Sequence, residues 1–356
     1  MSNTDLMNFF AQHVADGRPL VLASVYETAG STYSKVGARM LIGGDAIFQG
    51  MLSGGCLEGD LAERATRVIE TGRPEQVTYD LGLNEEELWG LGVGCDGLMR
   101  VFLQPLLAAD GYEPFATMAG ALGCDAATVC ATALRGGGNG PAAGASLVTG
   151  GGTTSNFGFP KQWLAEVETR ALDALHDGRS RTTTVEVAGE SADLLFGVLR
   201  PSPRVLVLGA GLDAQPVVRI CAELGWRVTV QDHRPAYVEK GDFSAAWQVV
   251  SVPAEQLPDK LDLDSFDGAI IMSHHLATDR AYLRLLARTR MRYVGLLGPR
   301  DRRRRLIQEL GDASEGLRER LRGPAGLDIG GRGPASIALS IVAEMHREII
   351  GDREGY

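Results

Sequence analysis

Two glycine-rich segments of the sequence each place a cysteine next to an acidic residue. The first reads LSGGCLEGD over residues 52–60, with Cys56 and Glu58 at the start of a helical pattern. The second reads GLGVGCDG over residues 90–97 and contains Gly94 and Cys95. Thiolate is the reactive and metal-ligating form of cysteine, and the N-terminus of a helix favours it. Both segments are therefore candidates for presenting a thiol to a soft metal.

Cys56 has three possible roles: a nucleophile, a ligand, or a small residue that fills a tight turn. No Ser-His-Asp or nucleophile-elbow pattern accompanies it, and none of the five cysteines forms a CxxC pair. We therefore expect free thiols, with neither a disulfide framework nor a structural zinc site. For Cys124, Cys130 and Cys221 we expect buried structural cysteines, the commoner role of a single thiol.

A third candidate site is the turn GAGLDA over residues 209–214, which follows an apolar strand pattern and precedes a helical one. In a dinucleotide-binding turn, Gly209 makes the tight bend and Gly211 lets backbone amides approach a pyrophosphate. Asp232 ends the next strand pattern and is expected on a ribose 2′-OH. The turn predicts a ligand that carries phosphate. NAD is one option for this ligand. The Asp213 carboxylate argues against it, because it would crowd a pyrophosphate.

Polar residues also follow two later strand patterns. His274 and His275 come after the run GAIIM, and Arg300 comes after YVGLLGP. Parallel strands end at one edge of their sheet, where ligands bind. Adjacent histidines point apart in an extended segment, so one is expected to face the ligand and the other the fold. The basic run Arg300, Arg302, Arg303, Arg304 and Arg305 is expected to be a solvated helix start, in which Arg300 alone contacts an anion.

These residues need elements to position them, and the sequence predicts two domains of the α/β class. Residues 21–81 and 127–187 look like copies of one αβ unit within a domain spanning 1–199. SGGCLEGD in the first copy aligns with NFGFPKQW in the second, so the fold is expected not to require Cys56. A linker over 200–203 precedes a Rossmann-like domain over 204–356, where alternating strand and helix patterns predict a doubly wound parallel sheet.

Composition narrows the function classes. The chain has 356 residues and a net charge of −10, which argues against nucleic acid as a partner because phosphate binding needs a basic surface. Nowhere do 18 apolar residues run together, and the N-terminus lacks the pattern of a signal peptide. We therefore expect a cytoplasmic protein that does not span a membrane.

Blocks spread along nearly the whole chain resemble the XdhC/CoxI family of accessory proteins, which mature molybdenum hydroxylases such as xanthine dehydrogenase. The blocks that carry the resemblance are GSTYSKVGARML, GMLSGGCLEGDL, WGLGVGCDGLMRVFLQPL, VLVLGAGLDAQPV, VTVQDHRPAY, MSHHLATDRAYL, GLLGPRDRRRRL and GLDIGGRGPASIALSIVAE.

The resemblance implies an N-terminal XdhC/CoxI domain and a C-terminal Rossmann domain. It implies binding of molybdenum cofactor, as molybdopterin or its cytosine dinucleotide form, and delivery to an apo molybdenum hydroxylase of the xanthine or aldehyde dehydrogenase type. A cysteine desulfurase would supply the sulfido ligand while the cofactor is protected, and a homodimer is expected. The cofactor-binding residues implied are Ser53, Gly54, Gly55, Cys56, Glu58, Gly94, Cys95, Gly209, Gly211, Asp232, His274 and His275, with Cys56 and Cys95 as candidate molybdenum ligands.

Three other functions remain open, although a cofactor chaperone is favoured over a catalyst. An NAD-dependent oxidoreductase would need a proton-transfer residue, and the histidine pair is the one candidate. A sulfur-transfer enzyme would instead carry a persulfide on Cys56. A regulatory or scaffolding role of the same fold is a third alternative.

Overall fold

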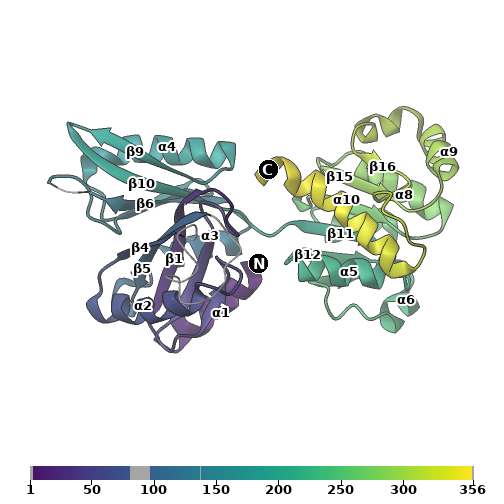
Figure 1. Cartoon of the computed structure of the whole chain (residues 1–356). Helices are drawn as coiled ribbons and strands as arrows, with labels where there is room; N and C mark the ends of the chain where they lie inside the picture. The colour runs from purple at the N-terminus through teal and green to yellow at the C-terminus, as the bar shows by residue number, and fades with distance from the viewer. Residues whose placement is uncertain (1–2, 81–96, 137, 355–356) are drawn as a thin grey trace. The chain divides into compact units, whose positions relative to one another are not determined.

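The chain forms two units, each built on its own sheets (Figure 1). The computed structural model describes residues 3–80, 97–136 and 138–354. The first unit extends from Asn3 to Pro201 and the second begins at Ser202. The division between them lies inside the proline-containing segment 200–203.

The first half of the first unit is an antiparallel sheet with the strand order β3-β2-β1-β5-β4. Residues of β1 alternate between two layers: Val21, Ala23 and Val25 pack with helix α2, and Leu20 and Leu22 pack toward the second sheet. This period of two explains why β1 is apolar on both faces. The elements are α1 (Asn3–Ala15), β1 (Leu20–Ala29), β2 (Arg39–Gly43), β3 (Phe48–Gly50), α2 (Glu58–Thr71), β4 (Glu75–Asp80) and β5 (Leu98–Leu106).

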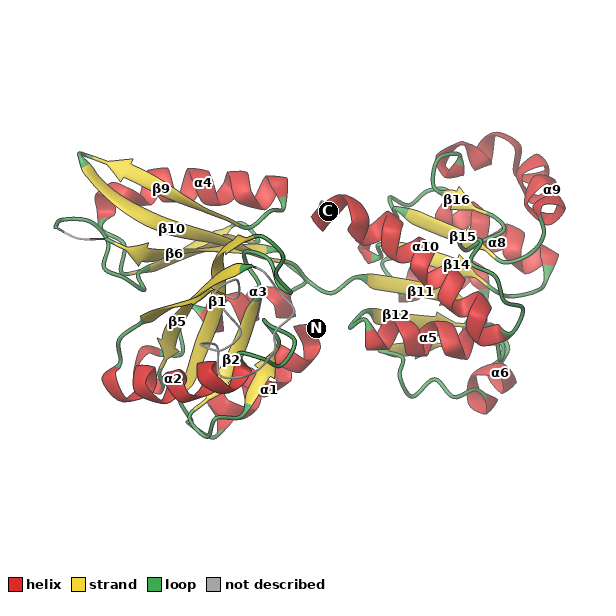
Figure 2. Cartoon of the chain, viewed as in Figure 1, coloured by secondary structure: helices red, strands yellow, loops and turns green. Residues whose placement is uncertain are grey.

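The second half repeats this plan, with the strand order β8-β7-β6-β10-β9. Helix α4 covers its sheet as α2 covers the first (Figure 2). The other faces of the two sheets pack together in one buried cluster, which includes Leu41 of β2 and Val148 of β7. The elements are α3 (Phe115–Gly123), β6 (Thr128–Arg135), β7 (Ser146–Gly150), β8 (Thr153–Phe157), α4 (Leu164–Asp177), β9 (Arg181–Val187) and β10 (Glu190–Leu199).

The match between the halves extends to single residues. Helices α2 and α4 each have 14 residues, and each is followed by a left-handed glycine, Gly72 at φ 62° and Gly178 at φ 70°. In the β2-β3 hairpin, Ile42 pairs with Phe48, the sixth residue after it. In the β7-β8 hairpin, the equivalent residue Thr149 pairs with Thr154, the fifth residue after it. The first hairpin turn is therefore one residue longer than the second.

Strand pairing corrects the alignment of the cysteine segment with the second copy. Gly50 pairs with Met40 as Asn156 pairs with Leu147, so Gly50 and Asn156 are equivalent. Counting forward from these two residues places Cys56 opposite Gln162, not opposite Phe159 as the sequence alignment suggested. The second copy still has no cysteine at this place in the fold.

The second unit contains a six-stranded sheet of order β13-β12-β11-β14-β15-β16, in which every pairing is parallel. This confirms the predicted doubly wound sheet. The elements are β11 (Arg204–Leu208), α5 (Ala214–Glu223), β12 (Arg227–Gln231), α6 (Pro235–Lys240), β13 (Gln248–Val250), α7 (Leu257–Lys260), β14 (Gly268–Ile271), α8 (Leu276–Leu286), β15 (Tyr293–Leu296), α9 (Arg300–Leu310), β16 (Leu321–Arg322) and α10 (Pro334–Glu354).

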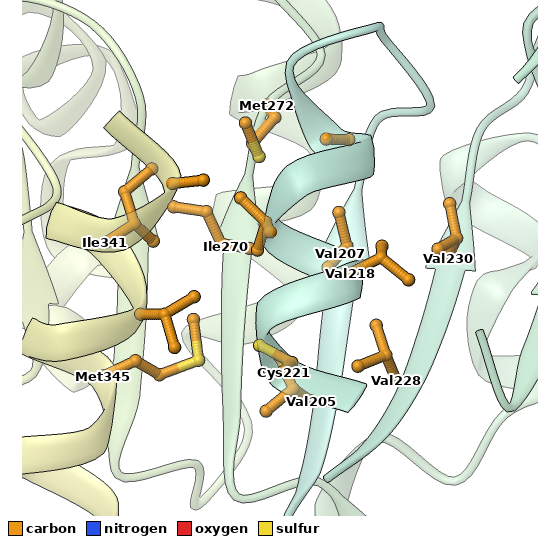
Figure 3. Close-up of a cluster of buried hydrophobic side chains, with 14 of the residues drawn as sticks. Val205, Val207, Val218, Cys221, Val228, Val230, Ile270, Met272, Ile341 and Met345 are labelled. Atoms are coloured by element: carbon orange, nitrogen blue, oxygen red, sulfur yellow. The ribbon is translucent and has the colours of Figure 1, made fainter. Parts of the chain in front are cut away.

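The core on one face of this sheet joins α5, α10 and the central strands (Figure 3). Ile341 and Met345 of α10 pack there with Cys221 of α5. Burial raises the pKa of Cys221 to about 12, so this thiol stays protonated and behaves as an apolar side chain. Cys130 is buried in the first unit, as expected, but the expectation was wrong for Cys124, which is exposed.

Within the described ranges, no helix has the length and apolar character needed to cross a membrane.

Candidate functional site

The Cys56 segment is a seven-residue loop, residues 51–57, between the edge strand β3 and helix α2. Gly54 and Gly55 have φ values of 79° and 108°, which favour glycine over residues with a side chain. A Cβ on Gly54 would lie 3.3 Å from the Tyr33 ring, whereas one on Gly55 would meet nothing within 4 Å. The loop therefore packs on one side and is open beside Gly55.

The Glu58 carboxylate holds this loop from inside. Its Oε1 accepts hydrogen bonds from the amides of Leu52 and Ser53, both at 2.8 Å. Its Oε2 accepts from the Ser53 hydroxyl at 2.5 Å and from the Gly55 amide at 3.0 Å. Burial alone would raise the pKa of Glu58, but these hydrogen bonds favour the charged form and lower it below its ordinary value. Glu58 and Ser53 thus position the loop around Cys56.

Cys56 itself is half-buried and reduced, immediately before the first turn of α2. It packs at the margin of the core between α2 and the first sheet. Among the described residues, no hydrogen bond or ion pair to Cys56 is found. The described residues therefore supply no general base that would activate this thiol as a nucleophile. Tyr33, which lies against Gly54, and Met51, at the start of the loop, are exposed, at 63% and 47%.

The predicted residues Gly94 and Cys95 lie outside the described part of the chain, so their roles stay predictions. The described residues that flank segment 81–96 approach the Cys56 helix and its neighbours. At the end of β4, the Tyr79 hydroxyl donates to Asp60 in the first turn of α2 at 2.5 Å. On the other side, a Cβ on Gly97 would lie 2.4 Å from the Ser31 carbonyl oxygen, so this close approach requires glycine.

In the second unit, the glycine turn 209–213 lies between β11 and α5, as predicted. Gly209 has a φ of 128°, and a Cβ there would lie 2.5 Å from the carbonyl oxygen of Met272. The turn thus packs against the segment that follows β14, at the carboxyl edge of the parallel sheet. Leu212 at its tip is 80% exposed.

Asp232 has a structural role that the sequence did not reveal. It is 1% exposed, and its Oδ2 accepts from the Ala210 amide of the glycine turn at 2.8 Å. Arg234 donates to both oxygens: Nε to Oδ1 at 2.9 Å and Nη2 to Oδ2 at 2.8 Å. Burial opposes the charge, but the bonds from Arg234 and Ala210 lower the pKa of Asp232. Arg234, in the motif QDHRP, is therefore a residue of this edge that sequence reasoning missed.

The two histidines make different contacts, but the segment is not extended at His274 as expected from the sequence, and both residues are exposed. His275 precedes α8 and caps it, with its Nδ1 accepting from the Thr278 amide at 3.4 Å. His274 has a left-handed φ of 59° and extends toward the glycine turn, where its Nε2 lies 2.8 Å from Oδ2 of Asp213. The His274 side chain is 59% exposed. An outlying backbone conformation at a ligand-binding edge is typical of a functional residue.

The basic run that begins α9 is only partly solvated. Arg300 is exposed at the first position of the helix, as predicted. Arg302 instead donates to the buried carboxylate of Asp279 through Nε at 2.9 Å and Nη2 at 2.6 Å. Asp279 also accepts from the Ser273 hydroxyl at 2.5 Å. The expectation for Arg302 was therefore wrong: this ion pair fixes the segment that presents His274.

Matches to known proteins cover both units. Residues 13–80 match the XdhC and CoxI family, and residues 205–345 match the XdhC Rossmann domain. A Bacillus subtilis protein named as a probable subunit of xanthine dehydrogenase is 28% identical over 330 residues, 93% of each chain. The molybdenum cofactor insertion chaperone PaoD of Escherichia coli is 22% identical over 96% of this chain and 86% of its own length.

A similar architecture is found in a crystal structure described as a xanthine dehydrogenase from Bacillus halodurans. That chain is 28% identical, with a TM-score of 0.80, and the match covers 100% of the present chain and 97% of the other.

Proposed function

The chain belongs to the XdhC and CoxI family, and from this premise we propose that it binds molybdenum cofactor and delivers it to an apo molybdenum hydroxylase. The client would be of the xanthine or aldehyde dehydrogenase type, and the protein would protect the cofactor during sulfuration. A relative that matches over most of both lengths is named as a molybdenum cofactor insertion chaperone. This name supports a role in insertion.

The observation that carries the proposal is the Cys56 loop. Two halves of one unit share their topology, but only the first half has a thiol on a glycine loop held by a buried carboxylate. The equivalent Gln162 in the other half shows that this fold forms without a cysteine at that place. A cysteine sulfur presented on this loop is a soft ligand, the type that suits a soft metal such as molybdenum. Cys95 remains the second proposed ligand, with Gly94 beside it.

We propose that the glycine turn of the second unit binds the phosphate end of the cofactor. The N-terminus of α5 carries a partial positive charge, and hydrogen bonds hold the turn at Gly209 and Ala210. His274 and Arg300 lie at the same carboxyl edge of the sheet. We propose these residues as contacts to the pterin phosphate or its dinucleotide extension.

The proposed partners follow from this role. An apo hydroxylase receives the cofactor, and a cysteine desulfurase supplies sulfur for the sulfido ligand. A homodimer is proposed from the family resemblance.

None of the alternative functions is favoured by a specific observation. An NAD-dependent oxidoreductase would use Asp232 for the ribose, but both oxygens of this carboxylate already accept two hydrogen bonds. A persulfide carrier would need its thiol activated, and no described side chain bonds to Cys56. We therefore propose a carrier of cofactor, with no chemical step assigned to the chain.

Delivery and protection are tested with protein purified from cells that make molybdenum cofactor. The loaded protein is desalted, exposed to air for increasing times and then mixed with an apo molybdenum hydroxylase. We expect hydroxylase activity to survive longer exposure than it does with free cofactor. A desalted wild-type protein that contains no molybdenum would overturn the proposal.

A further inference from the structure

The end of β12, next to the glycine turn, carries a guanidinium beside the carboxylate that a dinucleotide-binding fold presents to ribose. Asp232 occupies the carboxylate position, but it is 1% exposed. Its Oδ1 accepts from the backbone amide and the Nε of Arg234, both at 2.9 Å. Its Oδ2 accepts from Nη2 of Arg234 and the amide of Ala210, both at 2.8 Å. A ribose diol would have to displace these donors.

Arg234 is held on two sides and open on a third. Its Nε and Nη2 edge is bound to Asp232, and its Cζ lies 3.7 Å from the centre of the Tyr237 ring. The side chain is 32% exposed, and within the described residues no hydrogen bond from its Nη1 is found. The planar fork of arginine suits phosphate oxygens, and a guanidinium already fixed by a carboxylate and a ring loses little freedom on binding.

We propose that Arg234 is a specificity-determining residue that binds a phosphomonoester at the β12 end of the glycine turn. Asp232 is then a positioning residue, which binds both the guanidinium and the amide of Ala210 and so fixes Arg234 relative to the glycine turn. The site selects ligands with a terminal phosphate over ligands with a free ribose diol. Where the ligand is the pterin, this inference rests on the proposed function and adds that the phosphomonoester form is preferred.

Two sources supply a phosphomonoester: the side chain of a pterin phosphate, or the 2′-phosphate of NADP. The test therefore uses two ligand pairs, each differing by one phosphate. The first pair is a fluorescent oxidised pterin phosphate derived from the cofactor and its phosphatase-treated form. The second pair is NADP and NAD. Equilibrium titration measures the affinity ratio within each pair for wild type, R234K and R234Q.

The matched control is R284Q, which removes an exposed arginine from the last turn of α8. Thermal unfolding of each variant checks that the second unit is intact. A charge-assisted hydrogen bond corresponds to a change in affinity of about tenfold to a hundredfold. We expect wild type to prefer the phosphorylated member of at least one pair by about this factor. R234Q should abolish the preference, R234K should retain part of it, and R284Q should match wild type.

Preference in the pterin pair identifies the pterin as the source, and preference in the NADP pair identifies the nucleotide. Equal affinities within both pairs in wild type overturn the inference, as does a preference that survives in folded R234Q. If both pterins bind equally and no NADP preference is seen, the proposed function stands and this inference fails. If neither pterin binds but NADP is preferred through Arg234, the inference stands and the proposed function fails.

Discussion

Ser53 and Glu58 close the glycine loop around Cys56 by bonding to each other and to its backbone. The Ser53 hydroxyl donates to Glu58 at 2.5 Å and accepts from the Leu57 amide at 2.8 Å. Glu58 is 2% exposed, so its side chain lies inside the loop rather than on its surface. The two residues were predicted as cofactor contacts, and their geometry gives them a positioning role in addition. The thiol is thereby held at a defined place before helix α2.

Replacing Glu58 with glutamine should destabilise the first unit by about 1–3 kcal/mol, because buried amides and a hydroxyl lose a charged acceptor. The pKa of Glu58 is lowered in the folded chain. Its stabilising effect is therefore complete above the pKa of an unfolded glutamate, about 4.3, and declines as the pH falls through the lower folded value. Urea denaturation at neutral and acidic pH measures the difference between wild type and E58Q.

The matched control for this prediction is E63Q, an exposed position on the same helix. We expect E63Q to have the stability of wild type within about 0.5 kcal/mol. A stability difference between E58Q and wild type that stays constant down to the most acidic pH at which both fold would contradict the role assigned to Glu58.

His274 should be replaceable by glycine without loss of stability. Its φ of 59° is costly for a side-chain-bearing residue, by about 1–2 kcal/mol, and glycine removes that cost. The exposed bond to Asp213 offsets part of the gain, so thermal unfolding of H274G should occur at or above the wild-type temperature. Cofactor binding should nevertheless fall.

The comparison for H274G is A188G, at another left-handed residue, between β9 and β10. A188G should be at least as stable as wild type and bind cofactor normally. Clear destabilisation of H274G, or full cofactor binding by it, would show that His274 is not retained for the ligand.

The ion pair between Asp279 and Arg302 should matter far more than a surface pair on the same helix. D279N leaves the Arg302 guanidinium without its charged partner and should cost about 3 kcal/mol. D301N removes the partner of Arg304, whose pair with Asp301 is exposed, and should change stability little. Chemical denaturation measures the free energy of unfolding of wild type, D279N and D301N. Equal losses would contradict the assignment of Asp279 as a structural anchor.

The sequence was sufficient for the architecture because its periodicities are strong. Alternating strand and helix patterns after residue 204 indicated the parallel sheet, and glycines at equivalent places such as Gly72 and Gly178 revealed the duplication. The alignment of the copies within the cysteine segment was three residues wrong. Hairpin registers determine that alignment, and residue types alone do not reveal which residues pair across a hairpin.

The candidate site was less predictable, because which groups bond to one another depends on tertiary contacts. The sequence pattern placed Asp232 at the correct edge of the sheet. It did not reveal that Arg234 donates hydrogen bonds to both carboxylate oxygens of Asp232. Likewise, the run from Arg302 to Arg305 resembles a solvated helix face, whereas Asp279 from another helix withdraws Arg302 from solvent. When two charged residues lie on separate helices or strands, the local sequence around each of them does not indicate that they form an ion pair.

The most direct test of the central claim is the molybdenum content of wild type, C56A and C124A after purification from cofactor-producing cells and desalting. Cys124 is an exposed thiol in the same unit and controls for the loss of a cysteine as such. We predict that wild type and C124A retain equal molybdenum and that folded C56A retains at least tenfold less. Equal retention by all three proteins would contradict the claim that the Cys56 loop holds the cofactor.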